Sequence, residues 1–390
     1  MSLLQPQAAS GATTLGVLGG GQLGRMFVHA AQALGYRVAV LEPDAASPAG
    51  AAADHHLAKP YLDAQALEAM AHDCQAVTTE FENVPADALR RLAVSCRVAP
   101  PADAVEVCQH RAREKACFAR AGVPCAPHAV LAHAADLELP GLQDLLPGIL
   151  KTASQGYDGK GQATVSSVAA LGSAWAALGS VPCVLEKRLP LRCELSVIVA
   201  RGHDGQMVHL PVQQNLHRDG ILAVTQAPAP EVDADTAAQA VAWAEALARQ
   251  LDYVGVLCIE FFVLQDGSLV ANEMAPRPHN SGHYSINACD VSQFELQVRT
   301  LAGLPLVTPR QHSPAIMLNL LGDLWLQSGA SRTPDWAAVL VLPGVSLHLY
   351  GKTEARRGRK MGHLTVTAAD AASARATALQ AAAALGLPAF

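Results

Sequence analysis

The sequence is poor in charge and has no basic excess. Only 16% of its 390 residues are charged, and the formal net charge at pH 7 is −6. Proteins that bind nucleic acid without sequence preference need a surplus of lysine and arginine to neutralise phosphates, so this balance argues against that class. We therefore expect any anionic ligand to be held by local clusters of basic residues.

Membrane and export signals are also missing. The chain has no apolar run of about 18 residues free of charge and turn signals, the length that a membrane-spanning helix needs. The opening residues, MSLLQPQAASGATT, have neither the basic region nor the apolar region of a secretory signal. We expect a cytoplasmic protein whose partners are small molecules rather than a membrane or a nucleic acid.

The cysteines form no disulfide pattern. There are nine of them, an odd number, and none belongs to a C-x-x-C pair. A chain of this length buries enough core to fold without disulfide bonds. We expect reduced, mostly buried thiols, as in proteins of the cytoplasm. The length also predicts two or three domains.

The first hundred residues have the pattern of a parallel α/β domain. A buried strand over residues 14–19, a helix over 26–34 and a second strand over 36–41 make a βαβ unit. We place this domain at residues 13–105. The preceding residues 1–12 are expected to be a disordered leader.

A glycine-rich turn, G-x-G-x-x-G over residues 19–24, joins the first strand to the helix. With Glu42 further along, it satisfies the dinucleotide fingerprint. Its physical content is a helix N-terminus that accepts an anion, and a ribose phosphate would fit as well as a dinucleotide. Gln22 and Arg25 are polar where an adenine dinucleotide site usually has small residues. We favour phosphate binding and keep an NAD enzyme as the alternative.

A further strand of this domain, residues 76–79, ends in polar side chains. Ligands of open α/β sheets bind outside the carboxyl ends of the strands. Glu80 and Asn83 are therefore candidates for recognising a hydroxyl or an amine. A helix N-cap at Asn83 explains that residue equally well.

The middle of the chain contains the loop KTASQGYDGKGQ over residues 151–162. A short apolar strand ends in Lys151, the loop contains three glycines and Lys160, and strand character resumes at 163–165. Glycine lets backbone N–H groups approach an anion closely, and the two lysines supply compensating charge. This is the pattern of a flap over a phosphate chain, although it is not a Walker A motif. A hairpin with a glycine-rich tip is the alternative.

Two carboxylates interrupt consecutive apolar strands further along. Glu260 lies in the strand 254–263 and Glu273 ends the strand 268–273, with a hairpin turn between them. An unpaired charge in such a run is costly, so two neighbouring carboxylates need a cation. Oxygen ligands of this kind fit Mg²⁺ that carries nucleotide phosphates. Separate surface carboxylates are the alternative.

A dense polar cluster follows the second of these strands. Residues 277–283 contain Arg277, His279, Asn280, Ser281 and His283. Such a cluster is costly in a core and inexpensive at a binding site.

The remaining middle segments have ordinary explanations. We expect a helix over 104–121 with a solvated basic face, a polar connection over 211–222 that contains His217, and an amphipathic helix over 234–251.

The strongest basic cluster lies near the C-terminus. A strand over 347–352 ends in Lys352, and a turn with four cations follows at 356–363. No aromatic residues interleave with these cations, which favours a phosphate site over a nucleic-acid surface. Arg356 and Arg357 are equally well explained as solvated side chains. A terminal helix is expected over 368–385.

The motifs occur in the order found in the ATP-grasp superfamily: the glycine loop, Glu186, Glu194, Glu260 and then Asn272-Glu273. More narrowly, the chain resembles the ATPase subunit of phosphoribosylaminoimidazole carboxylase, the 5-(carboxyamino)imidazole ribonucleotide synthase family. The resemblance covers residues 15–367 and rests on GGGQLGRM, TTEFENVP, QGYDGKGQ, ELSVIVAR, NLHRDGI, NEMAPRPHNSGH and GRKMGH. One departure is Gln155, which stands where the family often has the first of two glycines and predicts a slightly stiffer loop.

The resemblance implies an ATP-grasp fold of the α/β and α+β classes. It would have a Rossmann-like preATP-grasp domain, a split ATP-grasp domain over 106–305 and a small C-terminal β domain over 306–390. It also implies a homodimer.

The implied reaction is the ATP-dependent carboxylation of 5-aminoimidazole ribonucleotide with bicarbonate, through carboxyphosphate, in de novo purine (IMP) biosynthesis. Mg²⁺ would be held by Glu260 and Glu273. The residues that the resemblance assigns to ATP are Arg111, Lys151, Gly156, Tyr157, Asp158, Gly159, Lys160, Gly161, Gln162, Glu186, Lys187, Arg188, Leu189, Glu194, His217, Asn272 and Glu273.

The second substrate would lie between the glycine turn of the first domain and the basic C-terminal segment. The residues expected to contact the ribonucleotide are Gly21, Gln22, Leu23, Glu80, Asn83, His279, Asn280, Ser281, Lys352, Arg359 and Lys360. The residues expected to act in catalysis are Tyr157, Asp158, Arg277 and Lys352. A formate-using transformylase of the same superfamily and a non-enzymatic scaffold remain as alternatives.

Overall fold

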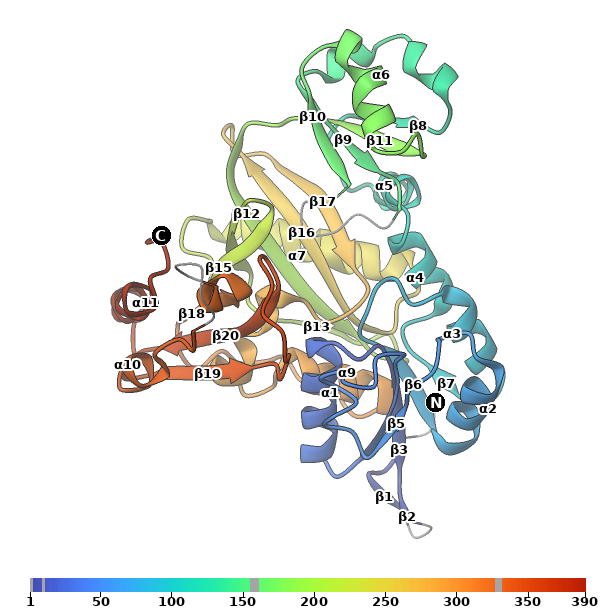
Figure 1. The fold of residues 1–390 in the computed structure, drawn as a ribbon, viewed down its shortest axis with the longest axis vertical. Coiled ribbons are helices and arrows are strands. Elements are labelled where there is room, and N and C mark those ends of the chain that lie inside the picture. The colour runs from blue at the N-terminus through green and yellow to red at the C-terminus, as the bar shows by residue number, and fades with distance from the viewer. Residues whose placement is uncertain (1–2, 9–10, 155–160, 327–331) are drawn as a thin grey trace.

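The computed structural model describes residues 3–8, 11–154, 161–326 and 332–390. In this part of the chain the strands form four sheets. A parallel sheet near the N-terminus lies at one end of the molecule, a small antiparallel sheet lies at the other end, and a large sheet lies between them (Figure 1). The fourth sheet is a short hairpin of two-residue strands.

The N-terminal unit is a five-stranded parallel sheet in the order β5-β4-β3-β6-β7, as the βαβ pattern predicts. Its three central strands are buried almost throughout, which is usual for parallel strands covered by helices on both faces, and the two edge strands are partly exposed. Its elements are β3 (Thr14–Leu18), α1 (Gln22–Ala33), β4 (Arg37–Leu41), β5 (His55–Leu57), α2 (Ala64–Asp73), β6 (Ala76–Thr79), α3 (Ala86–Leu92) and β7 (Arg97–Val98). Helix α1 begins four residues earlier than expected, directly after the glycine turn.

The expectation of a disordered leader is wrong for its described part. β1 (Gln7–Ala8) pairs with β2 (Gly11–Ala12) in an antiparallel hairpin. The backbone N–H of Leu4 donates to the carbonyl of Ala302 at 2.9 Å, and the hydroxyl of Tyr36 donates to the carbonyl of Leu4 at 2.6 Å. These bonds attach the segment to two other parts of the chain.

The single helix expected over 104–121 is two helices, α4 (Ala102–Cys108) and α5 (Arg111–Arg120). The side-chain amide of Gln109, at the break, donates to the carbonyls of Glu82 and Val84 at 2.8 and 2.7 Å. The alternative interpretation of Asn83 as a helix N-cap is wrong, because α3 begins at Ala86 with Pro85 in the cap position.

The small lobe is a four-stranded antiparallel sheet in the order β10-β9-β11-β8. Lys151 is paired with Gln162 across β9 and β10, so the glycine loop connects the two strands of a hairpin. Residues 155–160 of that loop, including Gln155, lie outside the described residues. The elements of the lobe are β8 (His128–Leu131), η1 (Ala134–Glu138), η2 (Leu142–Leu145), β9 (Gly148–Thr152), β10 (Gln162–Val165), α6 (Val168–Ala177) and β11 (Cys183–Lys187).

The large sheet has the order β17-β16-β12-β14-β15-β18-β20-β19, with β13 paired to β12. The segment expected to be a polar connection is the hairpin of β14 and β15, inside this sheet. The strands are β12 (Leu191–Arg201), β13 (Met207–His209), β14 (Gln213–Arg218), β15 (Ile221–Ala227), β16 (Gly255–Leu264), β17 (Leu269–Ala275), β18 (Ala315–Leu321), β19 (Val345–Leu349) and β20 (Lys360–Thr367).

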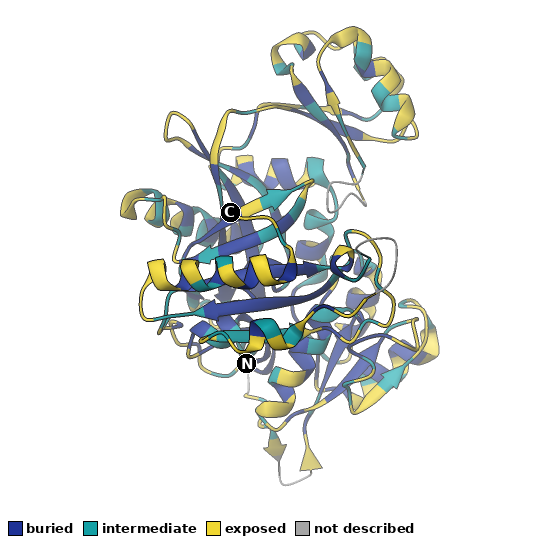
Figure 2. Ribbon diagram, turned by 60° about the vertical axis from the view of Figure 1, so that its left-hand side comes forward, coloured by how far each residue is buried: buried dark blue, intermediate teal, exposed yellow. Residues whose placement is uncertain are grey.

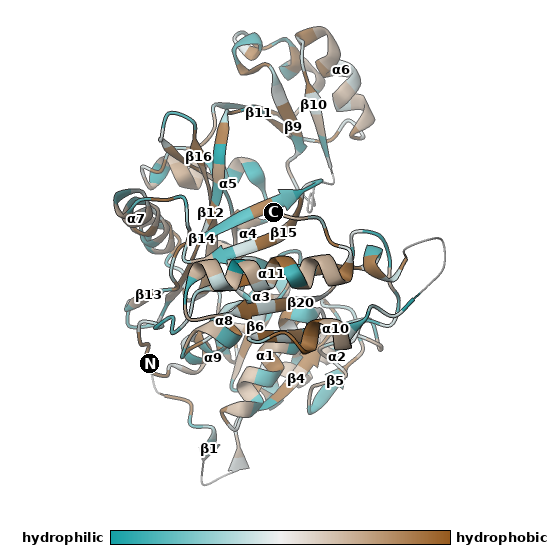
Figure 3. Cartoon of the chain, turned by 90° about the vertical axis from the view of Figure 1, so that its left-hand side faces the viewer, coloured by the Kyte–Doolittle hydropathy of each residue, from teal (hydrophilic) through white to brown (hydrophobic). Residues whose placement is uncertain are grey.

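The C-terminal part does not form a sheet of its own. β18 pairs with β15, from Ala227 opposite Ala315 to Val224 opposite Leu318, so the C-terminal strands extend the ATP-grasp sheet. Helix α11 (Ala371–Leu385) lies across them (Figure 3) and packs Ala378 and Leu385 against Leu364. Within the same part lie η4 (Gly322–Trp325) and α10 (Trp336–Leu340).

Two further helices close the core of the large sheet. α7 (Ala234–Gln250) packs its buried alanines against β12 and β16, as its amphipathic pattern predicts. α9 (Gln293–Ala302) lies between the sheet and the N-terminal unit, where Val298 and Leu301 share a cluster with Phe27. Figure 2 shows buried strands beneath helices whose outer faces are exposed. Among the residues described, no helix combines the length and apolarity needed to cross a bilayer.

A network of buried charges joins α5 to both sheets. Lys115, which the sequence predicts to be solvated, is only 1% exposed. Its ammonium group lies 3.2 Å from a carboxylate oxygen of Glu186 in β11 and donates to the carbonyl of Asn272 in β17 at 2.7 Å. The other carboxylate oxygen of Glu186 accepts a hydrogen bond from Lys151 at 2.8 Å. Burial alone would raise the pKa of Glu186, but the charges of Lys151 and Lys115 outweigh it and lower that pKa.

A cluster of histidines lies where α9, the C-terminal strands and α8 (Ser285–Ala288) meet. The ring of His363 stacks on His348 at 4.5 Å and lies 4.9 Å from that of His283. Its Nδ1 shares a hydrogen bond of 2.9 Å with the hydroxyl of Tyr350. Burial, followed by the neighbouring histidines, lowers the pKa of His283 and His363 well below the ordinary value.

We expect Lys115→Met to destabilise the protein strongly. The substitution leaves the buried carboxylate of Glu186 with one cation instead of two, and breaking a buried ion pair costs about 3 kcal/mol or more. Urea unfolding measures the loss. Arg113→Met on the same helix is the control, because the Arg113 side chain is 53% exposed and pairs with Glu106 at the surface. Equal unfolding midpoints for the two variants would contradict the role of the buried network.

The histidine cluster predicts acid sensitivity. Below about pH 6.5 the unfolded chain binds protons that the buried histidines of the folded state do not, so stability falls as pH falls, by about 1.4 kcal/mol per pH unit for each histidine. Unfolding measured between about pH 7 and pH 5 should show this slope, and His363→Gln should reduce it. His72→Gln, at an exposed position, should leave the slope unchanged. An unchanged slope in His363→Gln would show that this histidine does not cause the acid sensitivity.

Candidate active site

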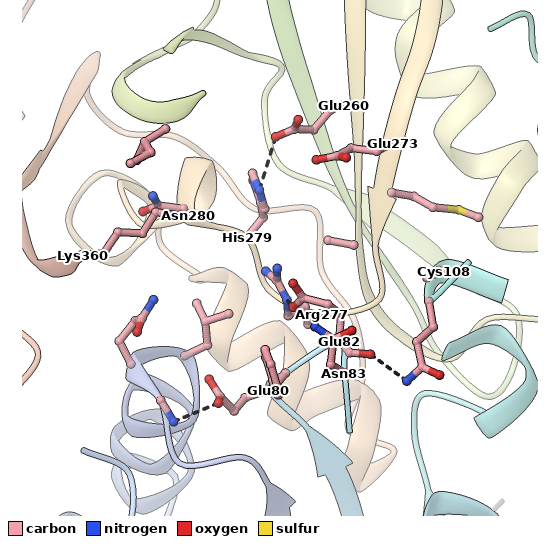
Figure 4. Close-up of a pocket in the computed structure, with 18 of the residues that line it drawn as sticks. Glu80, Glu82, Asn83, Cys108, Glu260, Glu273, Arg277, His279, Asn280 and Lys360 are labelled. Carbon is pink, nitrogen blue, oxygen red and sulfur yellow. Dashed lines mark hydrogen bonds and ion pairs between the residues drawn. The ribbon is translucent and has the colours of Figure 1, made fainter. Parts of the chain in front are cut away.

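A cavity of about 730 Å³ lies where the N-terminal unit, the β16–β17 hairpin and the C-terminal strands meet. Figure 4 shows how side chains from these separate parts converge on it. Fourteen of the predicted site residues line it: Gly21, Gln22, Leu23, Glu80, Asn83, Arg111, Glu260, Glu273, Arg277, His279, Asn280, Lys352, Arg359 and Lys360.

The two predicted metal ligands face each other. Glu260 on β16 and Glu273 on β17 are direct partners in the strand register, next to a β-bulge. Burial and the charge of Glu273 raise the pKa of Glu260 to about 7. Burial also opposes ionisation of Glu273, but the charges of Arg111 and Lys151 outweigh it and lower that pKa. Arg111 donates to Glu273 at 3.1 Å, and Nε2 of His279 lies 3.3 Å from Glu260.

This pair suits a metal that also binds phosphate. Within the described ranges, no three His, Cys, Asp or Glu side chains are grouped so that they alone could hold a metal ion. Mg²⁺ needs no such cage, since it takes one or two carboxylates and completes its shell with water and nucleotide phosphates. The neighbouring Asn272 has a buried side-chain oxygen with no hydrogen-bond partner in the described structure. The donors present therefore fit Mg²⁺ bound to a nucleotide.

The predicted nucleotide residues continue from this pair toward the small lobe. Lys151 and Glu186 form the buried pair on β9 and β11, and the backbone N–H of Arg111 donates to the carbonyl of Ala153 at 2.8 Å. His217 and Glu194 pair at 2.7 Å on adjacent strands. Burial lowers the pKa of His217, but Glu194 and Glu260 together raise it above its ordinary value.

Other predicted nucleotide residues lie toward the two ends of the small sheet. Lys187 ends β11, and Arg188 and Leu189 lead from it to β12. Gly161, with a φ of +70°, and Gln162 lead into β10. The loop residues predicted for ATP or catalysis that fall outside the described residues are Gly156, Tyr157, Asp158, Gly159 and Lys160.

The glycine turn of the N-terminal unit is occupied by the protein's own carboxylates. Glu80 accepts hydrogen bonds from the N–H groups of Gly21 and Gly24 at 2.9 and 3.0 Å, and Glu42 accepts one from Gly20 at 2.8 Å. Burial raises the pKa of Glu80, while the two N–H groups oppose the rise.

These bonds correct the sequence-based interpretation of the turn. The N–H groups of three of its glycines are already paired with carboxylates, and a phosphate placed there would meet two acidic side chains. The dinucleotide interpretation is therefore wrong. The expectation that the ribose phosphate lies against the backbone of this turn is not supported either. Gly21, Gln22 and Leu23 still contribute to the cavity wall.

An ion pair that the sequence analysis missed holds Arg277. The carboxylate of Glu82 accepts a hydrogen bond from Nε of Arg277, in the centre of the cavity wall (Figure 4). Burial raises the pKa of Glu82, but the charge of Arg277 outweighs it and lowers that pKa. Glu82 follows the same strand end as Glu80, so the rule that ligands bind at the carboxyl ends of strands could have found it.

The polar loop after β17 divides into residues at the cavity and residues behind it. Arg277, His279 and Asn280 line the cavity. Ser281 is fully buried, and its hydroxyl forms a hydrogen bond of 2.8 Å with Nδ1 of His279. Ser281 therefore supports the ring of His279 and does not line the cavity.

The C-terminal cations form the opposite wall. Lys352, Arg356, Arg357, Arg359 and Lys360 all line the cavity, and Arg356 and Arg357 are exposed at its edge. The ammonium group of Lys352 donates to the carbonyl of Lys360 at 2.7 Å, which ties the two arms of this turn together. In a protein of net charge −6, this wall is the predicted local cluster for an anion.

Three family profiles match consecutive parts of the chain. The ribonucleotide synthetase preATP-grasp domain matches residues 12–109, the ATP-grasp domain matches 116–294, and the phosphoribosylaminoimidazole carboxylase C-terminal domain matches 315–377. These matches confirm the predicted fold class.

Curated relatives share most of the chain. The chain is 43% identical over 356 residues to N5-carboxyaminoimidazole ribonucleotide synthase of Brucella melitensis, covering 90% of this chain and 96% of that protein. It is 38% identical over 351 residues to the synthase of the same name from Bacillus subtilis, covering 90% of each.

Solved structures agree with these relatives. The synthetase of Thermus thermophilus has a TM-score of 0.88 and 38% identity, with 96% of this chain and 99% of that chain covered. The synthase of Aspergillus clavatus, in complex with ADP and 5-aminoimidazole ribonucleotide, has a TM-score of 0.87 and 33% identity, with 96% and 98% covered. The chain therefore belongs to the N5-carboxyaminoimidazole ribonucleotide synthase family of ATP-grasp ligases, which form C–N bonds.

Proposed function

We propose that the protein carboxylates 5-aminoimidazole ribonucleotide with bicarbonate and ATP, giving N5-carboxyaminoimidazole ribonucleotide, ADP and phosphate in purine (IMP) biosynthesis. One observation carries the proposal: a single cavity is lined both by the buried pair Glu260 and Glu273 and by the cations Lys352, Arg359 and Lys360. The relative from Aspergillus clavatus, whose structure contains ADP and this ribonucleotide, supports it.

ATP would bind at the end of the cavity next to the small lobe. The buried Lys151 and the guanidinium of Arg111 supply positive charge for the phosphates. Glu186, Lys187, Arg188 and Leu189 would hold the rest of the nucleotide near the connection between the lobes. Glu194, His217, Asn272 and the glycine loop complete this set.

Glu260 and Glu273 would hold Mg²⁺. When bound, Mg²⁺ neutralises the phosphate charge and orients the terminal phosphoryl group. Arg111 and His279 already contact these carboxylates, so they hold the two side chains in place before the nucleotide arrives.

The first step would be attack of a bicarbonate oxygen on the terminal phosphorus of ATP. A new O–P bond forms, the bond to ADP breaks, and carboxyphosphate results. Arg277, fixed by Glu82, and His279 lie between the two ends of the cavity and would orient this anion. Carboxyphosphate is labile in water, so the glycine loop with Tyr157 and Asp158 would exclude solvent.

The second step would be attack of the ribonucleotide's amine on the carboxyl carbon. The C–N bond forms, the C–O bond to phosphate breaks, and the amine loses a proton. Lys352, Arg359 and Lys360 would hold the ribose phosphate. The residues that would surround the rest of the substrate are Gly21, Gln22, Leu23, Glu80, Asn83, His279 and Asn280.

Three further properties belong to the same proposal. We place the domain limits at residues 13–105, 106–305 and 306–390. A cytoplasmic location and a homodimer agree with the family resemblance.

Phosphate release from Mg-ATP in bicarbonate buffer tests the function. We expect 5-aminoimidazole ribonucleotide to stimulate release, because its amine is the acceptor of the carboxyl group. Formate and unrelated amines serve as controls. A rate of phosphate release that rises with formate but not with the ribonucleotide would agree with the ATP-grasp fold and contradict the substrate assignment.

We expect Glu273→Gln to reduce ATP turnover by at least about a hundredfold, because it removes a metal ligand without changing the size of the side chain. Steady-state rates at several Mg²⁺ concentrations and a thermal melt separate this loss from unfolding. Glu245→Gln, on α7, is the control. A Glu273→Gln enzyme with normal turnover and normal Mg²⁺ dependence would refute the metal assignment.

A further inference from the structure

The loop that carries Arg277, His279 and Asn280 has few backbone bonds of its own. It leaves the sheet at Ala275 and contains two prolines, which have no N–H group to donate. Its internal bonds are short-range, such as those from Gly282 to the carbonyl of His279 and from His283 to that of Asn280. Something outside the loop must therefore hold it against the cavity.

The side chain of Gln293 supplies that support. Gln293 is the first residue of α9 and is fully buried. Its oxygen accepts a hydrogen bond from the backbone N–H of His279 at 2.9 Å, and its amide nitrogen donates to the carbonyl of the same residue at 2.8 Å. One side chain thus makes both backbone bonds that a neighbouring strand would make to His279.

The amide nitrogen and the backbone N–H of Gln293 also contact the far end of the loop. Its amide nitrogen lies 3.0 Å from Nδ1 of His283. Its backbone N–H donates to the hydroxyl of Ser285 at 3.1 Å, and that hydroxyl donates to the carbonyl of Gly282 at 2.6 Å. A Cβ added at Gly282 would collide with the side-chain oxygen of Gln293, so the loop packs directly on it.

We infer that Gln293 is a positioning residue, which fixes His279 against Glu260 from behind the loop. Gln293 itself does not line the cavity. The ring of His279 is held at one nitrogen by Ser281 and lies next to Glu260 at the other, while Gln293 fixes the backbone that carries the ring. The role rests on the function proposed above, in which this loop orients the reacting anion.

The chemistry of the amide explains why glutamine stands here. The site needs one acceptor and two donors on a flat group that can reach three partners, and a carboxamide provides all of them. A glutamate of the same length lacks the donors, and a methionine of similar shape lacks every polar atom.

A second glutamine of α9 makes similar contacts with the strand that precedes the other polar loop. One turn further along α9, Gln297 is almost fully buried, and its amide lies 3.2 Å from the hydroxyl of Thr78 and from the carbonyl of Thr79. Thr79 directly precedes Glu80. α9 therefore supports both polar loops that line the cavity, one with each glutamine.

Steady-state kinetics of Gln293→Met test the inference. We expect kcat to fall about 10- to 100-fold, because small displacements of orienting groups have effects of this size, while KM for ATP changes by less than about twofold. Gln311→Met is the matched control, since the amide of Gln311 donates to the carbonyls of Ala227 and Ser313 and is not part of the cavity wall. It should lose stability without the selective loss of kcat.

Hydrogen exchange gives a readout that does not depend on turnover. The amides of residues 277–283 should exchange about tenfold faster in Gln293→Met than in the parent protein and stay unchanged in Gln311→Met. If the ribonucleotide does not stimulate phosphate release by the parent enzyme, the proposed function is wrong. The exchange data still test the positioning role in that case.

If Gln293→Met does not fold, Gln293→Glu tests the positioning role instead. It preserves the side-chain length and the acceptor for the N–H of His279, so its kcat and exchange rates should lie between those of the parent and of Gln293→Met. Normal kcat and normal exchange in either folded variant would overturn the inference. The inference would also be overturned if Gln293→Met changed kcat, KM for ATP and KM for the ribonucleotide only to the extent that Gln311→Met does.

Discussion

Two like charges that face each other across a strand pair are the constraint on which the site depends. Because Glu260 and Glu273 are register partners on β16 and β17, the sheet itself sets their separation. Burial makes the repulsion between them stronger than it would be in water. The surrounding groups are arranged to relieve it: Arg111 bonds Glu273, and His279 lies against Glu260. A divalent cation bound with a nucleotide would relieve it further.

The other buried carboxylates in and near the cavity are likewise stabilised by a group next to them. Glu186 is balanced by Lys151 and Lys115, and Glu82 by Arg277. Glu80 is stabilised by the backbone N–H groups of Gly21 and Gly24 at the start of α1. Only 16% of the residues are charged, and several of these charges lie in one buried region, where each one has a partner.

The sequence predicts best what depends on neighbouring residues. The β16–β17 hairpin, the helix α7 and the polar loop after β17 follow from local periodicity and turn residues, and all three occur as expected. The family resemblance also predicts residues from distant parts of the chain that the structure brings to one cavity, such as Asn83, Glu260 and Lys352. Long-range contacts are harder to predict: Lys115 looks like a surface residue of a basic helix until β11 and β17 are seen to cover it. The sequence likewise gives no sign that the carboxylate of Glu80 also binds the N–H groups of the glycine turn, because the fold brings these distant residues together.

The pairing of β15 with β18 has a consequence for how the site can change shape. Through that pairing, the strand that begins with Lys360 belongs to the same hydrogen-bonded sheet as β16 and β17, which carry the carboxylate pair. The strands that carry the two carboxylates and the strand that begins with Lys360 are thus fixed relative to each other. Lys151 and the glycine hairpin belong to a different sheet, which connects to β12 through Arg188 and Leu189. The small lobe shares no strand pairing with the large sheet, and the buried contacts of Glu186 with Lys115 tie it to α5 instead. In the proposed function, the two substrates would therefore be held by separate sheets: ATP next to the small lobe, and the ribonucleotide next to the large sheet.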